Sequence, residues 1–224
     1  MSTSGLYMVL LMIGLLLILG LSEYLYKNKQ VGSEYTRKIA HILGSLSSLI
    51  FVYIFDSYWY VVGIGVFFFV LLFFGKRKNM FNSIDAVQRR TSGSFLLPIA
   101  ISGLFISAKI LDNDLFFVLP VLILGISDPL AGILGIYFQK RTSNIRLFGH
   151  TLQKTCLGST AFFLSALLLS IIVLTIQGLP FAQAVIFAGI IAISSTFVEM
   201  ISTKGFDNIL VPATVLVLLV MLNY

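Results

Sequence analysis

The chain has 224 residues, of which 58% are hydrophobic and only 11% are charged. Soluble domains carry roughly 25% charged residues, so this composition excludes an ordinary soluble enzyme and indicates an integral membrane protein. The single cysteine, Cys156, excludes an intrachain disulfide and a cysteine-based zinc cluster. The net charge of +6 does not indicate a nucleic-acid partner, because basic loops beside membrane spans produce the same excess.

Apolar runs recur along the whole chain, and a spanning helix needs about 20 mostly apolar residues. They predict an all-α, polytopic transmembrane bundle of about eight spans that forms one membrane-embedded domain over residues 1–224. The expected spans are 5–22, 39–55, 58–74, 94–111, 115–137, 155–176, 181–200 and 207–223. No Lys or Arg precedes the first run, so we expect a retained helix there and not a cleaved signal peptide.

The connections between these runs alternate in charge. Lys and Arg occur in the connections at 23–38, 75–93, 138–154 and 201–206, whereas the other three contain none. Of the 15 basic residues, 14 fall on one side, and the exception is Lys109. The positive-inside rule predicts a cytoplasmic basic side, with both termini outside, in a cell inner or plasma membrane. The longest polar connection, 75–93, is expected to contain an amphipathic or interfacial turn.

Four groups of polar residues lie on the basic side. The first comprises Glu34, Arg37, Lys38 and His41. Their spacing of three and four residues puts them on one face of a helix, and Gly44, Ser45 and Ser48 extend that face inward. Two cations and an imidazole in this position suit a polyphosphate. The structural alternative is an anchor to lipid headgroups in which Glu34 pairs with Lys38.

The second group centres on Asp128, which lies inside an apolar run. An ionisable residue within a span is costly and is a functional hypothesis by default. Gly125, Gly132 and Gly135 share its face, so that backbones can approach closely there. Pro129 frees a backbone carbonyl and can kink the helix. A carboxylate beside bare backbone suits Mg²⁺, which takes one or two carboxylates plus substrate phosphates; the alternative is a structural pair with Lys or Arg.

The third group, Lys154 and Thr155 followed by Gly158 and Ser159, begins the run at 155–176. Free N–H groups at a helix N-terminus favour anions, so Lys154 is expected to contact phosphate. The segment resembles a P-loop only loosely, because one glycine is missing, the spacing is short by one and no strand is expected before it. We therefore do not predict a P-loop nucleotide-binding domain.

The fourth group lies near the end of the chain and contains Glu199, Asp207 and Asn208. Ser195 and Ser202 or Thr203 share a helix face with Glu199, which lies near the end of a span. Asp207 has a second explanation, because it is placed to cap the last helix. The four groups together offer cations for phosphates, carboxylates for a metal and a polar path into the bilayer. This combination suggests phosphoryl or nucleotidyl transfer to a lipid at the cytoplasmic interface.

Four motifs in order carry a family resemblance. They are Glu34-x-x-Arg37-Lys38-x-x-His41, Asp128-Pro-x-Ala131-x-x-x-Gly135, Lys154-Thr155-x-x-Gly158-Ser159 and Val198-Glu199 followed by Gly205-x-Asp207-Asn208-x-x-Val-Pro212. They resemble the CTP-dependent lipid kinase family, which contains dolichol kinase, phytol kinase and the yeast-type diacylglycerol kinase and is related to phosphatidate cytidylyltransferase. The resemblance implies transfer of the γ-phosphate of CTP to a polyprenol, phytol or diacylglycerol type of alcohol, with Mg²⁺ or another divalent cation.

The groups and the resemblance together predict the site residues. The expected catalytic residues are Asp128, Lys154, Glu199 and Asp207, and the expected metal ligands are Asp128 and Glu199. The expected nucleotide-binding residues are Arg37, Lys38, His41, Arg90, Gly135, Lys154, Thr155, Gly158, Ser159 and Asn208. Arg90 is included only because Arg90-Thr-Ser-Gly93-Ser94 looks like the glycine–serine turn of the family.

Two residues depart from the family pattern: Ser127 replaces a usual Gly, and Leu157 replaces a usual Glu whose loss would lower activity or move its role to Glu199. Two other functions stay open. A cytidylyltransferase making a CDP-lipid would use the same CTP and metal, and a non-catalytic transporter or scaffold would keep only a relict site. The longer acidic and glycine-rich signature typical of the cytidylyltransferase branch does not occur here, which favours the kinase.

Overall fold

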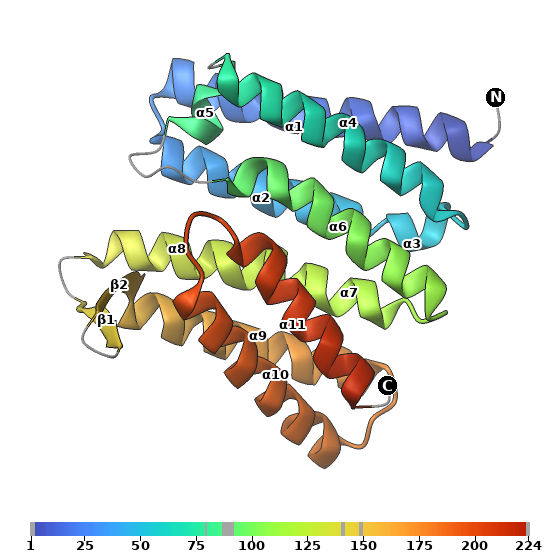
Figure 1. Cartoon of the computed structure of the whole chain (residues 1–224), viewed down its shortest axis with the longest axis vertical. Coiled ribbons are helices and arrows are strands. Elements are labelled where there is room, and N and C mark those ends of the chain that lie inside the picture. The colour runs from blue at the N-terminus through green and yellow to red at the C-terminus, as the bar shows by residue number, and fades with distance from the viewer. Residues whose placement is uncertain (1–2, 79, 87–91, 140–141, 148–149, 223–224) are drawn as a thin grey trace.

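The computed structural model describes residues 3–78, 80–86, 92–139, 142–147 and 150–222 (Figure 1). Helices account for most of this part of the chain. In chain order the elements are α1 (Thr3–Lys29), α2 (Ser33–Ser48), α3 (Phe51–Ile54), α4 (Tyr58–Arg77), α5 (Asn82–Asp85), α6 (Gly93–Ile110), α7 (Leu115–Leu122), the π-helix η1 (Ile123–Ser127), α8 (Asp128–Tyr137), β1 (Asn144–Leu147), β2 (His150–Thr155), α9 (Cys156–Ile176), α10 (Phe181–Ile201) and α11 (Asp207–Met221).

Seven helical stretches of the described chain are long and apolar enough to cross a membrane. They are Thr3–Lys29, Ser33–Ile54, Tyr58–Arg77, Gly93–Ile110, Leu115–Tyr137, Cys156–Ile176 and Phe181–Ile201. The eighth expected span corresponds to α11, an apolar helix of 15 residues. At 1.5 Å per residue α11 is about 22 Å long, whereas the hydrocarbon core of a bilayer is about 30 Å thick. The predicted helical bundle of a multi-pass membrane protein is confirmed, with α11 as its shorter member.

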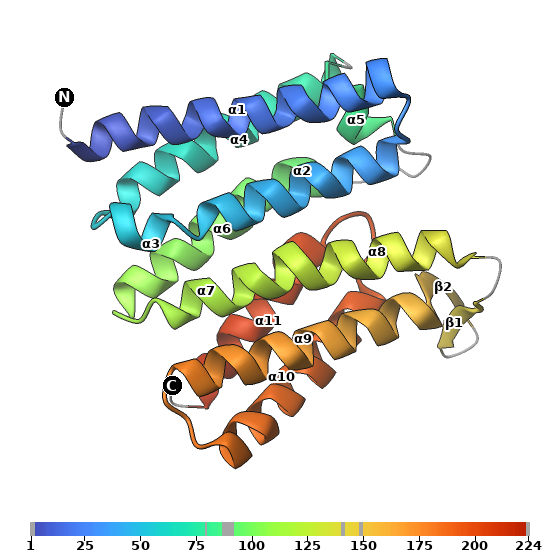
Figure 2. The same ribbon diagram turned by 180° about the vertical axis from the view of Figure 1, so that it is seen from behind.

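The helices form layers that are visible from both sides (Figures 1 and 2). α1 and α4 make one outer layer, α2 and α6 the next, and α7 to α8 a third beside α11, with α9 and α10 outermost on the other side. The connections around α5, the β1–β2 hairpin and the α10–α11 connection lie at one end of the bundle. The basic connections predicted from the sequence therefore gather at one end, and the assignment of that end to the cytoplasm stays a prediction.

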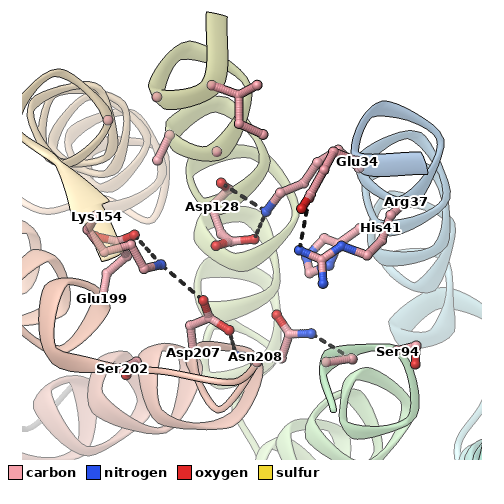
Figure 3. Close-up of a pocket in the computed structure, with 18 of the residues that line it drawn as sticks. Glu34, Arg37, His41, Ser94, Asp128, Lys154, Glu199, Ser202, Asp207 and Asn208 are labelled. Atoms are coloured by element: carbon pink, nitrogen blue, oxygen red, sulfur yellow. Dashed lines mark hydrogen bonds and ion pairs between the residues drawn. The ribbon is translucent and has the colours of Figure 1, made fainter. Parts of the chain in front are cut away.

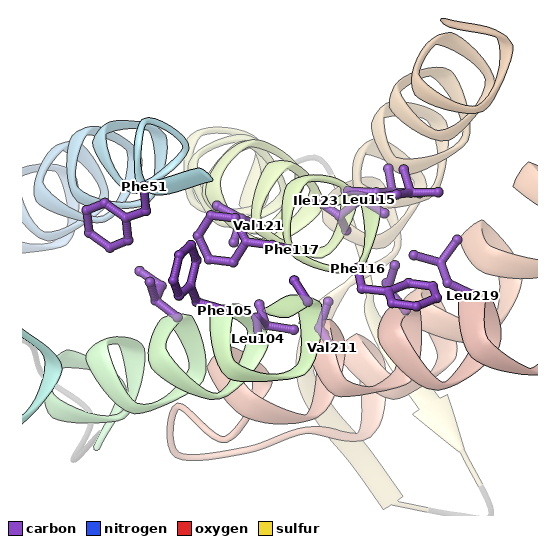
Figure 4. Packing of buried hydrophobic residues seen from close by; sticks show 14 of the residues in the cluster. Phe51, Leu104, Phe105, Leu115, Phe116, Phe117, Val121, Ile123, Val211 and Leu219 are labelled. Atoms are coloured by element: carbon purple, nitrogen blue, oxygen red, sulfur yellow. The ribbon is translucent and has the colours of Figure 1, made fainter. Parts of the chain in front are cut away.

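Aromatic packing closes the opposite end of the bundle (Figure 4). Phe51 of α3, Phe105 of α6 and Phe117 of α7 are almost completely buried. The ring centroids of Phe105 and Phe117 are 5.4 Å apart in an edge-on arrangement, and those of Phe51 and Phe117 are 6.3 Å apart and stacked. Such pairs contribute roughly 0.5–1.5 kcal/mol each beyond the area they bury. This end is a packed core, so the polar groups concentrate at the other end.

A π-helical turn, η1, precedes Asp128 and Pro129 in the middle of the fifth span. Within it, the backbone N–H of Asp128 donates to the carbonyl of Ile123, five residues back. The same spacing would assign the carbonyl of Leu124 to residue 129, which is a proline and has no N–H. The sequence predicts that Pro129 frees a carbonyl and can kink the helix, and the structure has a π-turn at this point. Such π-turns occur often at functional sites.

Two features of the connections bear on the predictions. A single turn of helix, α5, is present in the 75–93 connection, and Thr36 Oγ1 on α2 donates to the Ser83 carbonyl at 2.6 Å. β1 and β2 pair as an antiparallel hairpin, and β2 leads directly into α9. The expectation that no strand precedes this helix is therefore wrong. Among the described residues, this strand pairs with β1 alone, a local antiparallel contact that differs from the parallel sheet of a P-loop fold.

Candidate active site

A cavity of about 750 Å³ lies at the end of the bundle that carries the basic connections, and its volume is within the range of ligand-binding sites. All four predicted groups contribute to its wall (Figure 3). The predicted residues that line it are Arg37, Lys38, His41, Asp128, Gly135, Lys154, Thr155, Gly158, Ser159, Glu199, Asp207 and Asn208. The remaining predicted residue, Arg90, lies outside the described residues. The fold therefore brings together side chains that are up to 171 positions apart, from Arg37 to Asn208.

Lys38 and Asp128 form a closed pair across α2 and α8. Lys38 Nζ lies 2.7 Å from Asp128 Oδ2 and donates to the Asp128 carbonyl at 3.3 Å. Both residues are buried, with 6% and 4% of their surfaces exposed. Gly132 makes room for the lysine, because a Cβ there would lie 2.6 Å from Lys38 Cε. The described structure thus shows the structural alternative for Asp128, a pair with a lysine, and not the pair of Lys38 with Glu34.

His41 forms a hydrogen bond with the Leu124 carbonyl, for which Pro129 supplies no N–H donor. Its Nε2 lies 3.0 Å from the carbonyl oxygen of Leu124 in η1. A carbonyl only accepts hydrogen bonds, so this contact requires the tautomer that carries a proton on Nε2. His41 therefore lines the cavity and at the same time satisfies the backbone of the π-turn. Its neighbour Arg37 lies on the same face of α2, with one guanidinium nitrogen 3.5 Å from Glu34 Oε2.

Lys154, Glu199 and Asp207 form a shared-lysine cluster on the other side of the cavity. Lys154 Nζ lies 2.5 Å from Glu199 Oε1 and 3.1 Å from Asp207 Oδ2. Ser159 donates to the second oxygen of Glu199 at 3.2 Å. Burial alone would lower the pKa of Lys154, but the charges of Asp207 and Glu199 hold that pKa above its ordinary value. Lys154 is therefore a cation throughout the neutral pH range.

The predicted capping role of Asp207 is wrong. α11 begins with Asp207 itself, its N-cap position is Phe206, and no side chain caps it. One oxygen of the Asp207 carboxylate accepts a hydrogen bond from the adjacent backbone N–H of Asn208. The other oxygen is paired with Lys154. Asn208 in turn donates from its side-chain amide to the Gly93 carbonyl at 2.7 Å, which ties α11 to the start of α6.

Two glycines set how closely α8 and α9 approach. A Cβ on Gly158 would lie 2.9 Å from the Ala131 carbonyl, and one on Gly135 would lie 3.0 Å from Thr155 Oγ1. Thr155 caps α9, as its predicted position at a helix N-terminus allows, with its hydroxyl accepting from the Gly158 N–H at 3.1 Å. These residues line the cavity, and their contacts hold α8, which carries Asp128, against the start of α9, which follows Lys154 and Thr155 in the chain.

Sequence reasoning missed the apolar part of the cavity wall. Leu19 of α1, Leu72 of α4 and Leu97 of α6 line the cavity beside the charged groups. No signal marks them, because a leucine in an apolar run looks the same whether it faces a cavity, a neighbour or lipid. Leu157, which departs from the family pattern, is 38% exposed and does not belong to the cavity wall, so this departure leaves the described cavity unchanged.

The donor set for a metal is limited to carboxylates. In the described part of the chain, no three His, Cys, Asp or Glu side chains lie close enough together to hold a metal by themselves. Asp128 and Glu199 both line the cavity, and Oδ1 of Asp128 accepts no hydrogen bond from the described residues. Mg²⁺ typically takes one or two protein carboxylates and completes its shell with phosphates and water. The carboxylates therefore fit a metal that arrives with a phosphate ligand.

Fold and cavity together define a polytopic membrane protein with a charged cavity at one end of its helical bundle. Comparison with known proteins adds one relative. The chain is 26% identical over 180 residues to a phytol kinase of Synechocystis sp. (strain ATCC 27184 / PCC 6803 / Kazusa), covering 80% of this chain and 76% of that protein. The match agrees with the resemblance to lipid kinases that the four motifs suggested. No protein-family model matches the chain, and no solved structure is significantly similar to it.

Proposed function

We propose that the protein is a lipid kinase that transfers the γ-phosphoryl group of CTP to a membrane lipid alcohol. One observation carries the proposal: the same cavity at the end of a transmembrane bundle combines lysines, carboxylates and an apolar wall. A kinase acting on a lipid alcohol needs these three features, because its donor is a polyanion and its acceptor is a hydroxyl on a hydrocarbon chain. The relative named phytol kinase supports the same class of reaction.

The cations are placed to bind the phosphates. Arg37 lies at the cavity wall beside Glu34, and Lys38 and Lys154 each contact carboxylates that a polyphosphate can partly replace as their partners. In phosphoryl transfer the protein contributes mainly positioning and charge stabilisation. The transferred phosphorus forms a bond to the alcohol oxygen as its bond to the bridging β-phosphate oxygen breaks, and the hydroxyl proton leaves. Glu199 or Asp207 would accept that proton.

A divalent cation completes this proposal. Asp128 and Glu199 would hold it, and when bound it would neutralise charge on the phosphates of the donor. The assignment of CTP as the donor rests on the family resemblance. The cytoplasmic location of the cavity rests on the positive-inside rule, since the basic connections lie at the same end as the cavity.

A label-transfer experiment tests the proposal. Purified protein in nanodiscs is incubated with Mg²⁺, a panel of lipid alcohols and lipid phosphates, and CTP labelled at either the γ- or the α-phosphate. We expect label from the γ position in the lipid fraction, and the lipid that carries it identifies the acceptor. Reactions with ATP or GTP in place of CTP measure the choice of nucleotide.

The other outcomes separate the alternative functions. Label from the α position in a CDP-lipid would mean a cytidylyltransferase and would overturn the kinase assignment. The absence of label from either position, together with no detectable CTP binding, would favour a transporter or scaffold. An Asp128→Asn variant assayed in parallel controls for contaminating kinases, because the proposed site requires that carboxylate.

A further inference from the structure

A second, smaller cavity of about 90 Å³ adjoins the candidate active site. It lies among α1, α2, α4 and α6, and we call it the apolar groove. Its wall consists of Leu15, Ile18, Leu19, Ala40, Gly44, Ser48, Phe51, Val61, Ile64, Gly65, Phe68, Leu72, Ser94, Leu97, Pro98, Ile101 and Ser102. None of these side chains is charged, which contrasts with the lysines and carboxylates of the larger cavity.

The two cavities share part of their walls. Leu19, Ala40, Leu72, Ser94 and Leu97 line both of them. Ser94 is the polar residue of this shared wall. Its hydroxyl donates to Asp85 Oδ1 at 3.2 Å. The groove therefore borders the apolar side of the active-site cavity across this shared wall.

One wall of the groove belongs to the most loosely packed span. Within α1 only Leu19 and Ser22 are buried, and the long apolar side chains of its other faces are exposed. α1 and α4 form an outer layer of the bundle (Figures 1 and 2). In a membrane these exposed faces lie against hydrocarbon. One side of the groove is therefore formed by a span whose outer faces contact lipid.

We infer that the apolar groove binds the hydrocarbon chain of the lipid alcohol next to its hydroxyl group, which then lies at the junction near Ser94. This inference rests on the proposed kinase function and names where its acceptor binds. The wall shared with the larger cavity identifies the occupant, because a chain in the groove lies next to the cavity that the proposed function assigns to the phosphate donor. The groove is small, so it holds the part of the chain beside the hydroxyl, and the remainder extends into the bilayer.

Gly44 gives a way to fill the groove without disturbing the helix packing. It lies on α2 in the wall of the groove, and a Cβ at this position would meet no atom within 4 Å. Gly65 in the same wall is unsuitable, because a Cβ there would lie 2.0 Å from Ser102 Oγ. Gly103 on α6 is a matched control: a Cβ there also meets no atom within 4 Å, and Gly103 lines neither cavity.

The first test uses a long-chain primary alcohol with a photoreactive diazirine on a carbon close to the hydroxyl. Nanodisc-embedded protein is irradiated with this alcohol, and the labelled peptides are mapped by mass spectrometry with and without excess unmodified alcohol. We expect labelling of α1, α2, α4 or α6 residues of the groove that the unmodified alcohol suppresses. Gly44→Leu should abolish the suppressible labelling, whereas Gly103→Leu should retain it.

The second test is kinetic and uses Gly44→Ala, Gly44→Leu and Gly103→Leu in the transfer assay. Excluding about two methylene groups from an apolar site corresponds to a roughly tenfold loss of affinity. We therefore expect the KM for a long-chain alcohol to rise roughly tenfold in Gly44→Leu and much less in Gly44→Ala, with the KM for CTP unchanged.

The two tests separate failure of the inference from failure of the proposed function. Labelling requires no phosphoryl donor, so suppressible labelling in the groove supports the inference even in a protein without kinase activity. Suppressible labelling confined to other helices, or none at all in the wild-type protein, would overturn it. Normal kinetics of Gly44→Leu with a long-chain alcohol would also overturn it while the kinase assignment stood.

Discussion

The two ion-pair centres of the active-site cavity balance their charges differently. The closed pair joins one lysine, Lys38, to one carboxylate, Asp128, and both are almost fully buried. In the shared-lysine cluster, one cation, Lys154, is paired with two carboxylates, those of Glu199 and Asp207. The cluster therefore carries a surplus negative charge. Breaking a one-to-one buried pair leaves a charge without compensation, whereas the cluster can lose one carboxylate and stay paired. Loss of one partner should therefore destabilise the protein more at the closed pair than at the cluster. The cluster, with its surplus negative charge, is better suited to bind an additional cation.

The largest effect is expected at the closed pair. Asp128→Asn leaves Lys38 buried beside a neutral amide, so we expect the free energy of unfolding to fall by about 3–5 kcal/mol. If the protein still inserts in the membrane, turnover should fall on the order of 10²–10³-fold or more. Thermal unfolding in detergent and the label-transfer assay measure the two effects.

A double variant separates stability from chemistry at this pair. Lys38→Gln with Asp128→Asn removes both charges and leaves two amides that can bond to each other, so we expect most of the lost stability to return without the activity. Near-normal turnover of either Asp128 variant would contradict a role for this carboxylate in the reaction.

A smaller structural effect is expected at the shared-lysine cluster. Glu199→Gln leaves Lys154 paired with Asp207, so the free energy of unfolding should fall by only about 1.5–3 kcal/mol, as for the loss of one charged hydrogen bond. Turnover should fall, and the Mg²⁺ concentration required for half-maximal activity should rise about 10–100-fold if Glu199 holds the metal. A Mg²⁺ titration compared with Asp207→Asn checks this. Destabilisation equal to that of Asp128→Asn would remove the distinction between the two centres.

The π-turn offers a third test beside the closed pair. His41→Leu deprives the Leu124 carbonyl of its donor, and an unsatisfied buried acceptor costs roughly 1–3 kcal/mol. His41→Gln retains an N–H donor and should recover part of that loss. Equal melting temperatures for His41→Leu and the wild-type protein would show that the contact does not stabilise the turn.

The smallest effect is expected where α8, which carries Asp128, packs against α9, which begins two residues after Lys154. In Gly158→Ala the new Cβ lies 2.9 Å from the Ala131 carbonyl, so the helices must move apart. Overpacking costs about 1–3 kcal/mol, and the better helix propensity of alanine offsets up to about 1 kcal/mol of it. Gly189→Ala in α10 meets no atom within 4 Å and should be neutral or slightly stabilising. Similar unfolding temperatures for the two variants would show that the close approach is not required.

Much of the fold follows from residue spacing. Five of the seven spans coincide with an apolar run within three residues, because a bilayer accepts only segments whose backbone groups bond internally. The helix Thr3–Lys29 extends seven residues beyond the first expected run, and Ser33–Ile54 begins six residues before the second. The hairpin at β1 and β2 was not predicted, since its strands are short and lie in a polar connection that apolar periodicity does not mark. The glycine face around Asp128 was predicted, and its contacts with Lys38 and Ser45 agree with close backbone approach.

The sequence by itself determined that the protein spans the membrane, that its basic connections share one side, and that four polar groups accompany them. Only the tertiary structure decided which charges pair. Lys38 reaches Asp128, 90 positions away, and not Glu34, because α2 packs on the glycine face of α8 where space for a lysine side chain remains. The leucines that line the cavity were likewise invisible in the sequence, because helix packing, and not residue type, decides which apolar side chains face an open space.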